Sequence, residues 1–372
     1  MAAVSAACSS LGSSEAITTR PAPGETVDVA VEYAYVVNFG AGNVSAYSLD
    51  ATTGALTPVR GSPYAAGGDA NSVAVDPTGK SLYVANLHSN NVSAFTIATA
   101  SGALTQLKNS PFQAGTQPFG VAVDPTGKFA YVTNSAASNS SVLGYAIRTS
   151  GALKALKASP FKSGTSPQYV ALDPKGKFAY VPNSGSNNVS GYTVQNGGTL
   201  TPLTGSPFAA GTNATGVAID PTGKFIYATN SGSNNVSAYT IASNGALTQV
   251  KGSPFAAGTK PSGIAVDPQA KFLYVANAGS NNVFVYKIGS LGTLLQVRGS
   301  PFTSGTKPAG LAVDPTGSFL YVANAGSNNV TAFTIQRTGG LTLVRGSPFA
   351  AGAGPNAVVT CRVTRGKCVP PP

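Results

Sequence analysis

A ten-residue segment occurs twice without change, and this repetition limits what the chain can fold into. The segment YVANAGSNNV stands at residues 274–283 and again at 321–330, 47 positions later. Seven segments share its Tyr-x-x-Asn pattern, and they begin at Tyr35, Tyr83, Tyr131, Tyr180, Tyr227, Tyr274 and Tyr321. A period near 47 residues is typical of a four-stranded propeller blade and is longer than most helical repeats.

Each repeat contains four strand signals. In the unit around Val217 they are VAID, KFIYATN, VSAYTI and ALTQV, separated by turns rich in Gly, Pro, Asn and Ser. No segment has helical periodicity. Charged residues make up only 9% of the chain, and 44 Gly and 26 Pro are present, which disfavours long soluble helices. The sequence therefore predicts an all-β fold, a seven-bladed β-propeller with four antiparallel strands in each blade.

The number of strand signals predicts how the ring closes. The second strand occurs seven times, whereas the first strand with its Asp-Pro turn occurs six times. The segment GPNAVVT (354–360) follows the last Ser-Pro-Phe as a first strand should. We therefore expect the C-terminal strand to complete blade one. The competing segment, VDVAV (27–31), lacks an Asp-Pro-x-Gly turn before Tyr35 and is interpreted as a run-in to the second strand.

The chain is predicted to have three parts: a disordered tail (1–26), the propeller (27–360) and a C-terminal tail (361–372). Cys361 and Cys368 are close enough in sequence for a disulfide, which would indicate an oxidising compartment. Cys8 lies in Ala-Ala-Cys-Ser, which resembles a bacterial lipoprotein cleavage site, but the basic start and apolar run of a signal peptide are missing. Two interpretations stay open: a lipid anchor on a remnant of a lipoprotein signal, or a free thiol. We expect a bacterial-type extracytoplasmic protein that is periplasmic, secreted or lipid-anchored.

The net charge of +11 does not predict a nucleic-acid partner. The basic residues recur once per repeat, at a turn position (Lys80, Lys128, Lys177, Lys224, Lys271) and at the end of the fourth strand (Arg60, Lys108, Lys157, Lys251, Arg298, Arg345). This spacing produces a dilute ring of charge instead of a basic patch. We expect a monomer, and no apolar run approaches the roughly 18 residues of a membrane span.

The segments YVAN, YVTN and GVAVDPTGK resemble those of the YVTN-type seven-bladed propellers and the related lactonase family, whose named member is 6-phosphogluconolactonase. The resemblance covers about residues 33 to 360. It implies hydrolysis of a sugar lactone by His, Glu and Arg side chains around the channel. The sequence departs from this pattern because Glu occurs only at Glu15, Glu25 and Glu32, before the ring proper. No Arg occurs in the connections that precede the inner strands, which form the rim of the channel mouth, and His88 is the only histidine.

Binding residues are expected where the repeats differ, in the connection that precedes each inner strand. One variable position carries Asp69, Gln117, Ser166, Asn213, Lys260, Lys307 and Gly354. Two residues later the chain has Asn71, Phe119, Gln168, Thr215, Ser262, Ala309 and Asn356. We expect Lys260 and Lys307 to bind a small anionic or sugar-like ligand or an acidic peptide at the channel mouth. Hydrogen bonds would come from Asn71, Gln117, Gln168 and Asn356. Alternatively, these residues simply fill a solvated mouth.

A second hypothesis is catalysis by Asp69 and His88, which could activate water for attack on a lactone carbonyl. His88 replaces a Gly of most repeats, and a solvated loop side chain is the favoured interpretation. Six Asp-Pro aspartates (Asp76, Asp124, Asp173, Asp220, Asp267, Asp314) are interpreted as turn residues. Neither a cofactor nor a metal is expected. The preferred function is a binding or interaction scaffold, and a lactonase acting on a sugar lactone is the alternative.

Overall fold

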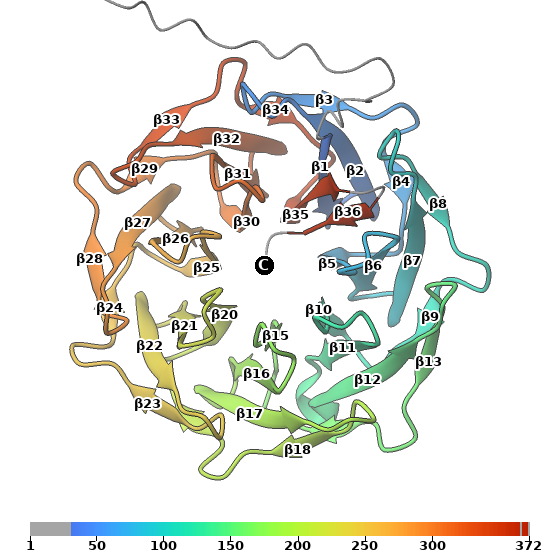
Figure 1. Cartoon of the computed structure of the whole chain (residues 1–372), viewed down its shortest axis with the longest axis vertical. Coiled ribbons are helices and arrows are strands. Elements are labelled where there is room, and N and C mark those ends of the chain that lie inside the picture. Colours follow the sequence, from blue (N-terminus) through green and yellow to red (C-terminus); the bar gives the residue numbers. More distant parts are fainter. Residues whose placement is uncertain (1–30, 365–366, 371–372) are drawn as a thin grey trace, which may run out of the picture. The chain divides into compact units, whose positions relative to one another are not determined.

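The structure is a computed structural model that describes residues 31–364 and 367–370. The predicted N-terminal tail with Cys8, and residues 27–30 of the competing segment, lie outside these residues. Seven antiparallel sheets are arranged around a central axis (Figure 1), so the predicted seven-bladed β-propeller is confirmed. Within the described ranges the only helical element is the short 3-10 helix η1 (Ala137–Asn139), and no helix is long and apolar enough to cross a membrane.

Blades 2 to 7 share one plan of four strands from the axis outward. The inner strands are β5 (Ala70–Val75), β10 (Pro118–Val123), β15 (Ala171–Leu172), β20 (Ala214–Ile219), β25 (Pro261–Val266) and β30 (Pro308–Val313). The second strands are β6 (Ser81–Asn86), β11 (Phe129–Asn134), β16 (Phe178–Asn183), β21 (Phe225–Asn230), β26 (Phe272–Asn277) and β31 (Phe319–Asn324). The third strands are β7 (Asn91–Ile97), β12 (Ser141–Ile147), β17 (Asn188–Val194), β22 (Asn235–Ile241), β27 (Asn282–Ile288) and β32 (Asn329–Ile335).

The outer edge of each blade has the expected fourth strand and a short fifth one. The fourth strands are β8 (Leu104–Gln106), β13 (Leu153–Ala155), β18 (Leu200–Pro202), β23 (Leu247–Gln249), β28 (Leu294–Gln296) and β33 (Leu341–Leu343). The fifth strands are β9 (Phe112–Gln113), β14 (Phe161–Lys162), β19 (Phe208–Ala209), β24 (Phe255–Ala256), β29 (Phe302–Thr303) and β34 (Phe349–Ala350). Each fifth strand pairs with the third strand of its blade, beside the fourth. The aromatic residue after Ser-Pro therefore belongs to a strand, which the sequence analysis did not predict.

Blade 1 is built from both ends of the chain. It contains β1 (Glu32–Asn38), β2 (Asn43–Leu49), β3 (Leu56–Pro58), β4 (Tyr64–Ala65), β35 (Pro355–Thr364) and β36 (Lys367–Val369). Strand β35 pairs antiparallel with β1 and takes the inner position, which confirms the predicted closure. The strand then continues past residue 360, and β36 folds back on it as a hairpin joined by the predicted Cys361–Cys368 disulfide.

The segment expected as a C-terminal tail (361–372) thus begins inside a sheet, and its boundary needs correction. The other inner strands stop at an Asp-Pro turn, such as Asp314-Pro315, whereas blade 1 has Cys361-Arg362 at this point. Without a proline at this place, nothing interrupts the strand, and β35 runs on to Thr364.

The repeated tyrosine of the Tyr-x-x-Asn pattern connects neighbouring blades. The buried hydroxyl of Tyr83 in blade 2 donates a hydrogen bond to the carbonyl of Gly151 in blade 3, at 2.8 Å. Tyr131 makes the equivalent bond to Gly198 at 2.8 Å. One blade cannot cover its own faces, so the tyrosines pack against the next blade, and six of the seven donate such a bond to it. The repetition is therefore explained by the ring.

The six aspartates of the Asp-Pro turns are buried and bonded to their own turns. In blade 3, for example, Asp124 Oδ1 accepts hydrogen bonds from the backbone N–H groups of Lys128 and Phe129, at 2.8 and 2.7 Å. The predicted turn role is confirmed. These turns and the β35–β36 hairpin lie at one end of the channel, which we call the turn face. The opposite end, with the connections at Asp69 and its six counterparts, is the mouth face.

Candidate functional site

The mouth face carries seven residues in the same left-handed backbone conformation. Their φ angles lie between 50° and 62°, and they are Asp69, Gln117, Ser166, Asn213, Lys260, Lys307 and Gly354. The backbone carbonyl accepts a hydrogen bond at all seven positions, and at six of them, Asp69 excepted, the N–H donates to a side chain of the preceding blade. The N–H of Lys260, for instance, donates to Asn234 Oδ1 in the preceding blade at 2.8 Å, and its carbonyl accepts from the N–H of Ala278 at 3.0 Å. Because the backbone makes these contacts, the side chain is free to differ between blades.

Lysine is an unfavourable choice for this conformation. A left-handed residue other than Gly is strained by about 1 kcal/mol, and Asn tolerates the conformation better than Lys does. Lys260 and Lys307 nevertheless occupy two neighbouring blades, and both are exposed. The backbone hydrogen bonds at these positions do not require a lysine. The presence of two exposed lysines in a conformation that disfavours them therefore favours a role for the ammonium groups. A binding role for them stays a prediction.

The predicted pair Asp69 and His88 is in contact. Asp69 precedes β5, His88 lies in the turn between β6 and β7, and Asp69 Oδ2 contacts His88 Nδ1. The Asp69 side chain is 23% exposed and that of His88 is 70% exposed. With Nδ1 as the donor to the carboxylate, Nε2 is the unprotonated nitrogen of the neutral ring. This arrangement can accept a proton from a water molecule at the mouth face.

A paired exchange of two residues makes room for His88. In blades 4 to 7 a glycine in the turn between the second and third strands packs against the threonine that directly precedes the left-handed residue. A Cβ atom on Gly279, for instance, would lie 2.9 Å from Thr259 Cγ2. Blade 2 has Gly68 in place of this threonine and His88 in place of the glycine, and a Cβ on Gly68 would lie 3.9 Å from that of His88. The sequence analysis recognised that His88 replaces a glycine, but it missed the matching change from threonine to Gly68.

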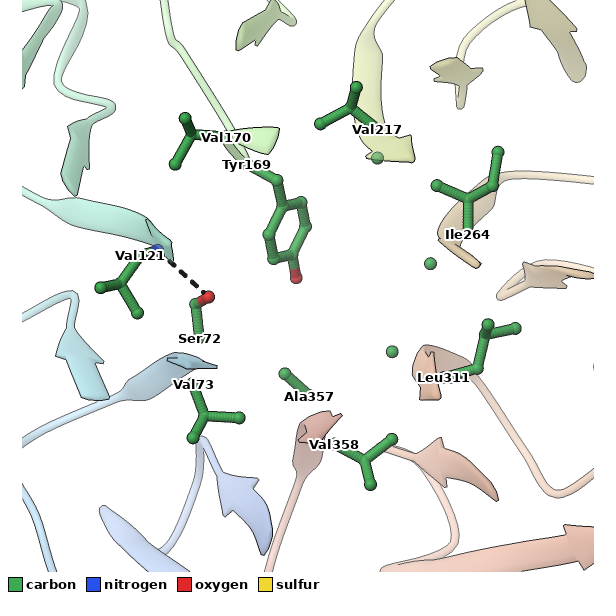
Figure 2. Close-up of a pocket in the computed structure, with 13 residues that line it drawn as sticks. Ser72, Val73, Val121, Tyr169, Val170, Val217, Ile264, Leu311, Ala357 and Val358 are labelled. Carbon is green, nitrogen blue, oxygen red and sulfur yellow. Dashed lines mark hydrogen bonds between the residues drawn. The ribbon is translucent and has the colours of Figure 1, made fainter. Parts of the chain in front are cut away.

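A cavity of about 180 Å³ lies between the inner strands. Valines, glycines and other residues of the inner strands line it, and Figure 2 shows the ring of Tyr169 pointing into it, with Ser72 on an adjacent wall. The ring of Phe119 meets that of Tyr169 edge-on, at 5.2 Å and 79°. Burial raises the pKa of Tyr169 to about 12, and Asn356 offsets part of the rise. The phenol is therefore a neutral donor at physiological pH.

Tyr169 takes the place of a glycine that brings adjacent inner strands together. A Cβ on Gly120 would lie 2.7 Å from the carbonyl oxygen of Gln168 in the next blade, and one on Gly216 would collide with that of Ser262. In blade 4 the inner strand β15 is reduced to Ala171–Leu172, so Tyr169 lies outside the ladder. Sequence analysis missed this residue too, although the change from Gly to Tyr was a visible signal.

The four amides predicted to bind a ligand occupy different environments. Asn356 donates to the carbonyl and Oδ1 of Asn71 at 2.9 and 3.0 Å. Asn71 in turn is 3% exposed and donates to the carbonyl of Phe119 at 2.8 Å. Gln168 donates to Ser166 and Ser184 within its own blade. Of the four, only Gln117 is exposed. The amides of Asn71 and Asn356 thus connect blades 1, 2 and 3, and a ligand would compete with those bonds.

Glu32 requires a correction, because it lies inside the ring and not before it. It is the first residue of β1, is fully buried, and its Oε1 lies 3.6 Å from Arg362 Nε. Neither carboxylate oxygen has a hydrogen-bond partner among the described residues. Burial and the nearby Asp314 raise the pKa of Glu32 to about 7, against the influence of Arg362. These groups lie at the turn face, so they do not join His88.

Comparisons with known proteins agree with the fold. The family described as "Lactonase, 7-bladed beta-propeller" matches residues 36–359. No curated protein matches the chain. The periplasmic gluconolactonase of Pseudomonas aeruginosa superimposes with a TM-score of 0.77 and 19% identity, covering 89% of this chain and 99% of that one. A Bacteroides fragilis protein, provisionally assigned as a 6-phosphogluconolactonase, gives 0.78 and 23% identity over 91% and 99%.

The fold alone does not fix the chemistry. The hydrazine synthase of Kuenenia stuttgartiensis also superimposes, with a TM-score of 0.61 and 22% identity over 81% of this chain and 94% of that one. At such identities a structural likeness shows the fold only. The family match is more specific, and it favours the lactonase alternative over the binding scaffold preferred from the sequence.

Proposed function

Because the chain belongs to the lactonase family of seven-bladed β-propellers, we propose that it hydrolyses a small lactone at the mouth face. The contact between Asp69 and His88 carries this proposal, since it is the one acid–base pair that faces the mouth among the described residues. The paired exchange at Gly68 and His88 supports it, because the scaffold of blade 2 differs at the residues that admit the imidazole.

The pair would act by general base catalysis. His88 Nε2 takes a proton from water as the water oxygen bonds to the lactone carbonyl carbon. The tetrahedral intermediate then breaks its ring C–O bond, and the imidazolium returns the proton to the departing ring oxygen, giving a hydroxy acid. Asp69 holds the ring through Nδ1 and stabilises the imidazolium. Such a base contributes about 10²- to 10⁴-fold to the rate.

The substrate class follows from Lys260 and Lys307. Both are exposed on blades 6 and 7, at the same face of the ring as the acid–base pair in blade 2. Two ammonium groups favour a lactone that carries a carboxylate or phosphate, and the hydroxyl groups of a sugar lactone suit the polar rim. A protein that binds such a ligand without turnover is the second candidate, supported by the same lysines.

The experiment measures hydrolysis of a neutral sugar lactone and of its phosphorylated counterpart, with spontaneous hydrolysis subtracted. We expect turnover by the wild type, loss of at least about a hundredfold in kcat for His88→Ala, and a raised KM for the phosphorylated substrate in Lys260→Ala/Lys307→Ala. Lys271→Ala, at the turn face, is the matched control. Binding without turnover would select the second candidate, and full activity of His88→Ala would remove His88 from the mechanism.

We further propose an extracytoplasmic location. The Cys361–Cys368 disulfide supports it, because such bonds persist in oxidising compartments. The Pseudomonas aeruginosa protein of similar fold is described as periplasmic. Fractionation of cells that express the full coding sequence should place the protein outside the cytoplasm, with the disulfide oxidised. Recovery from the cytoplasm with free thiols would contradict the proposal. Labelling with a radioactive fatty acid would test the anchor at Cys8.

A further inference from the structure

One large side chain enters the channel below the rim. The residue three positions after the left-handed residue is small in six blades, where it is Ser72, Gly120, Gly216, Gly263, Gly310 or Ala357. Blade 4 has Tyr169 at this position, and Figure 2 shows its ring extending toward the middle of the channel. A ligand that enters from the mouth face therefore meets Tyr169.

The Tyr169 side chain is held by residues of two other blades. Phe119 of blade 3 meets its ring edge-on, with 5.2 Å between the ring centroids. A side-chain hydrogen bond with Asn356 of blade 1 lowers the pKa of the phenol, against the larger effect of burial. Blades 1 and 4 are three blades apart in a ring of seven, so the side chain reaches across the channel. Tyr169 thus forms a fixed wall below the mouth.

The tyrosine coincides with a shortened ladder in blade 4. Strand β15 has two residues, whereas the inner strands of blades 2, 3, 5, 6 and 7 have six. Before β15, an isolated bridge joins Pro167 to Asn183 of the second strand. Departures from a repeated local pattern are expected at functional positions. The change from Gly to Tyr therefore favours a role for this side chain in the channel.

The channel cavity beside Tyr169 has the size and polarity for one hydroxylated ring. A cavity of about 150 Å³ holds benzene, so about 180 Å³ admits one six-membered ring. The lining residues, all within the described part of the chain, include no charged side chain. Ser72 Oγ accepts from the N–H of Val121 at 3.2 Å, which leaves its O–H to donate, as the neutral phenol of Tyr169 can.

We propose that the channel cavity binds one uncharged, hydroxylated six-membered ring, such as a pyranose sugar, and that Tyr169 excludes ligands with a second ring. A sugar ring presents C–H groups on its faces and hydroxyl groups at its edge. The C–H groups match the aromatic ring of Tyr169, and the hydroxyl groups match Ser72 and the phenol. The inference concerns binding below the rim, and it holds whether or not the protein hydrolyses a lactone.

Fluorine NMR of the full chain locates the bound ring. 3-Fluorotyrosine is incorporated at position 169, and the probe is methyl β-D-glucopyranoside, which has one ring. We expect this probe to shift the fluorine resonance until the site is saturated. Methyl β-maltoside, which has two rings, should leave the resonance unchanged at the same concentrations. No shift at position 169, or an equal shift by both sugars, overturns the proposal.

The matched control carries 3-fluorotyrosine at position 192 of the same blade. The hydroxyl of Tyr192 donates to the carbonyl of Lys162 at 2.7 Å, at the outer part of the blade. Neither sugar should shift this resonance. A shift at position 192 without one at position 169 would place the sugar outside the channel and overturn the proposal.

Substitutions separate stacking, hydrogen bonding and size selection. Tyr169→Gly restores the common residue. It should weaken binding of the one-ring sugar by at least about tenfold and remove the preference for one ring over two. Tyr169→Phe keeps the aromatic ring, so it should keep the size limit and weaken one-ring binding about fivefold, through loss of one hydrogen bond. Tyr192→Phe should bind as wild type does. Isothermal titration calorimetry measures the affinities.

The remaining outcomes also decide the question. Unchanged affinities and selectivity in Tyr169→Gly, with unchanged circular dichroism, mean that Tyr169 is not part of a sugar site. If that variant does not fold, the fluorine resonance of the full chain decides alone. A sugar-dependent shift in a protein that hydrolyses no lactone would refute the proposed function and support this inference. Lactone hydrolysis without the shift would do the reverse.

Discussion

The hydroxyl of Tyr321 in blade 7 donates a hydrogen bond to the carbonyl of Gly54 in blade 1, at 3.0 Å, across the junction where the ring closes. Tyr274 holds the same position in an identical ten-residue segment, and its buried hydroxyl has no partner among the described residues. The same local sequence thus has two hydrogen-bonding environments, because each tyrosine contacts a different blade.

This difference predicts different effects for one substitution. Tyr321→Phe should lower the free energy of unfolding by about 1–2 kcal/mol, because the buried Gly54 carbonyl loses its donor. Tyr274→Phe should be neutral or slightly stabilising, since it removes a buried hydroxyl without a partner. Urea denaturation of both variants measures the effects. Equal destabilisation would show that Tyr274 has a partner in solution.

Replacing the rim lysines by asparagine should separate stability from binding. Lys260→Asn/Lys307→Asn should raise the free energy of unfolding by up to about 1 kcal/mol per site, since Asn tolerates the left-handed conformation better. The same variant should raise the KM for an anionic lactone and leave that for a neutral lactone unchanged. The measurements are urea denaturation and steady-state kinetics. A variant with unchanged KM would show that the lysines do not contact substrate.

Restoring the common residue at position 68 should displace His88. Gly68→Thr introduces the side chain that occupies this space in blades 4 to 7, so the imidazole must move away from Asp69. We expect kcat for lactone hydrolysis to fall while the melting temperature changes little. Gly68→Thr/His88→Gly recreates the common pair and should be at least as stable as wild type, but inactive. Full activity of Gly68→Thr would mean that the contact is not needed.

Glu32 should make stability depend on pH. Its pKa is raised from 4.5 to about 7 in the folded protein, so the folded state binds the proton more tightly than the unfolded chain. The stabilisation is complete below about pH 4.5 and is lost as pH rises through 7. Glu32→Gln should remove this dependence and be more stable above pH 7, by up to about 3 kcal/mol.

The control for Glu32 is its neighbour. Arg362 lowers the pKa of Glu32, so Arg362→Gln should enlarge the loss of stability with rising pH and extend it above pH 7. Denaturation at a series of pH values compares the three proteins. Identical pH profiles for wild type and Glu32→Gln would show that the carboxylate reaches solvent or a partner.

The sequence predicted the seven-bladed ring well because the contacts within each blade are local and recur in every repeat. In five of the seven copies of Tyr-x-x-Asn the asparagine forms the same two bonds to the third strand, as Asn86 does by donating to Asn91 Oδ1 at 2.8 Å and Ser93 Oγ at 2.9 Å. The closing strand could be predicted because a repeat count left one inner strand unassigned. Strand β36 could not, because it depends on a single hairpin with no second copy for comparison.

The site was predicted less completely, because its contacts join blades that are distant in sequence. The variable rim positions located Asp69 and His88, which the structure brings together. Differences between the repeats could not show that Asn356 bonds Asn71, 285 residues away in the sequence. Nor could they show that Tyr169 lies outside the β-ladder of blade 4 and enters the channel. The sequence analysis placed Glu32 before the ring because of its position in the chain. Its burial depends on β35, which comes from the other end of the chain.

Closure of blade 1 by β35 has a consequence for biosynthesis. A ribosome that makes this protein has synthesised six complete blades before residues 355–364 exist, and until then β1 lacks its inner neighbour. The nascent chain must therefore hold an open arc, and the ring can close only after residues 355–364 have left the ribosomal tunnel. A premature stop before codon 355 would leave that arc permanently unsealed, so messages truncated there should yield protein that is degraded.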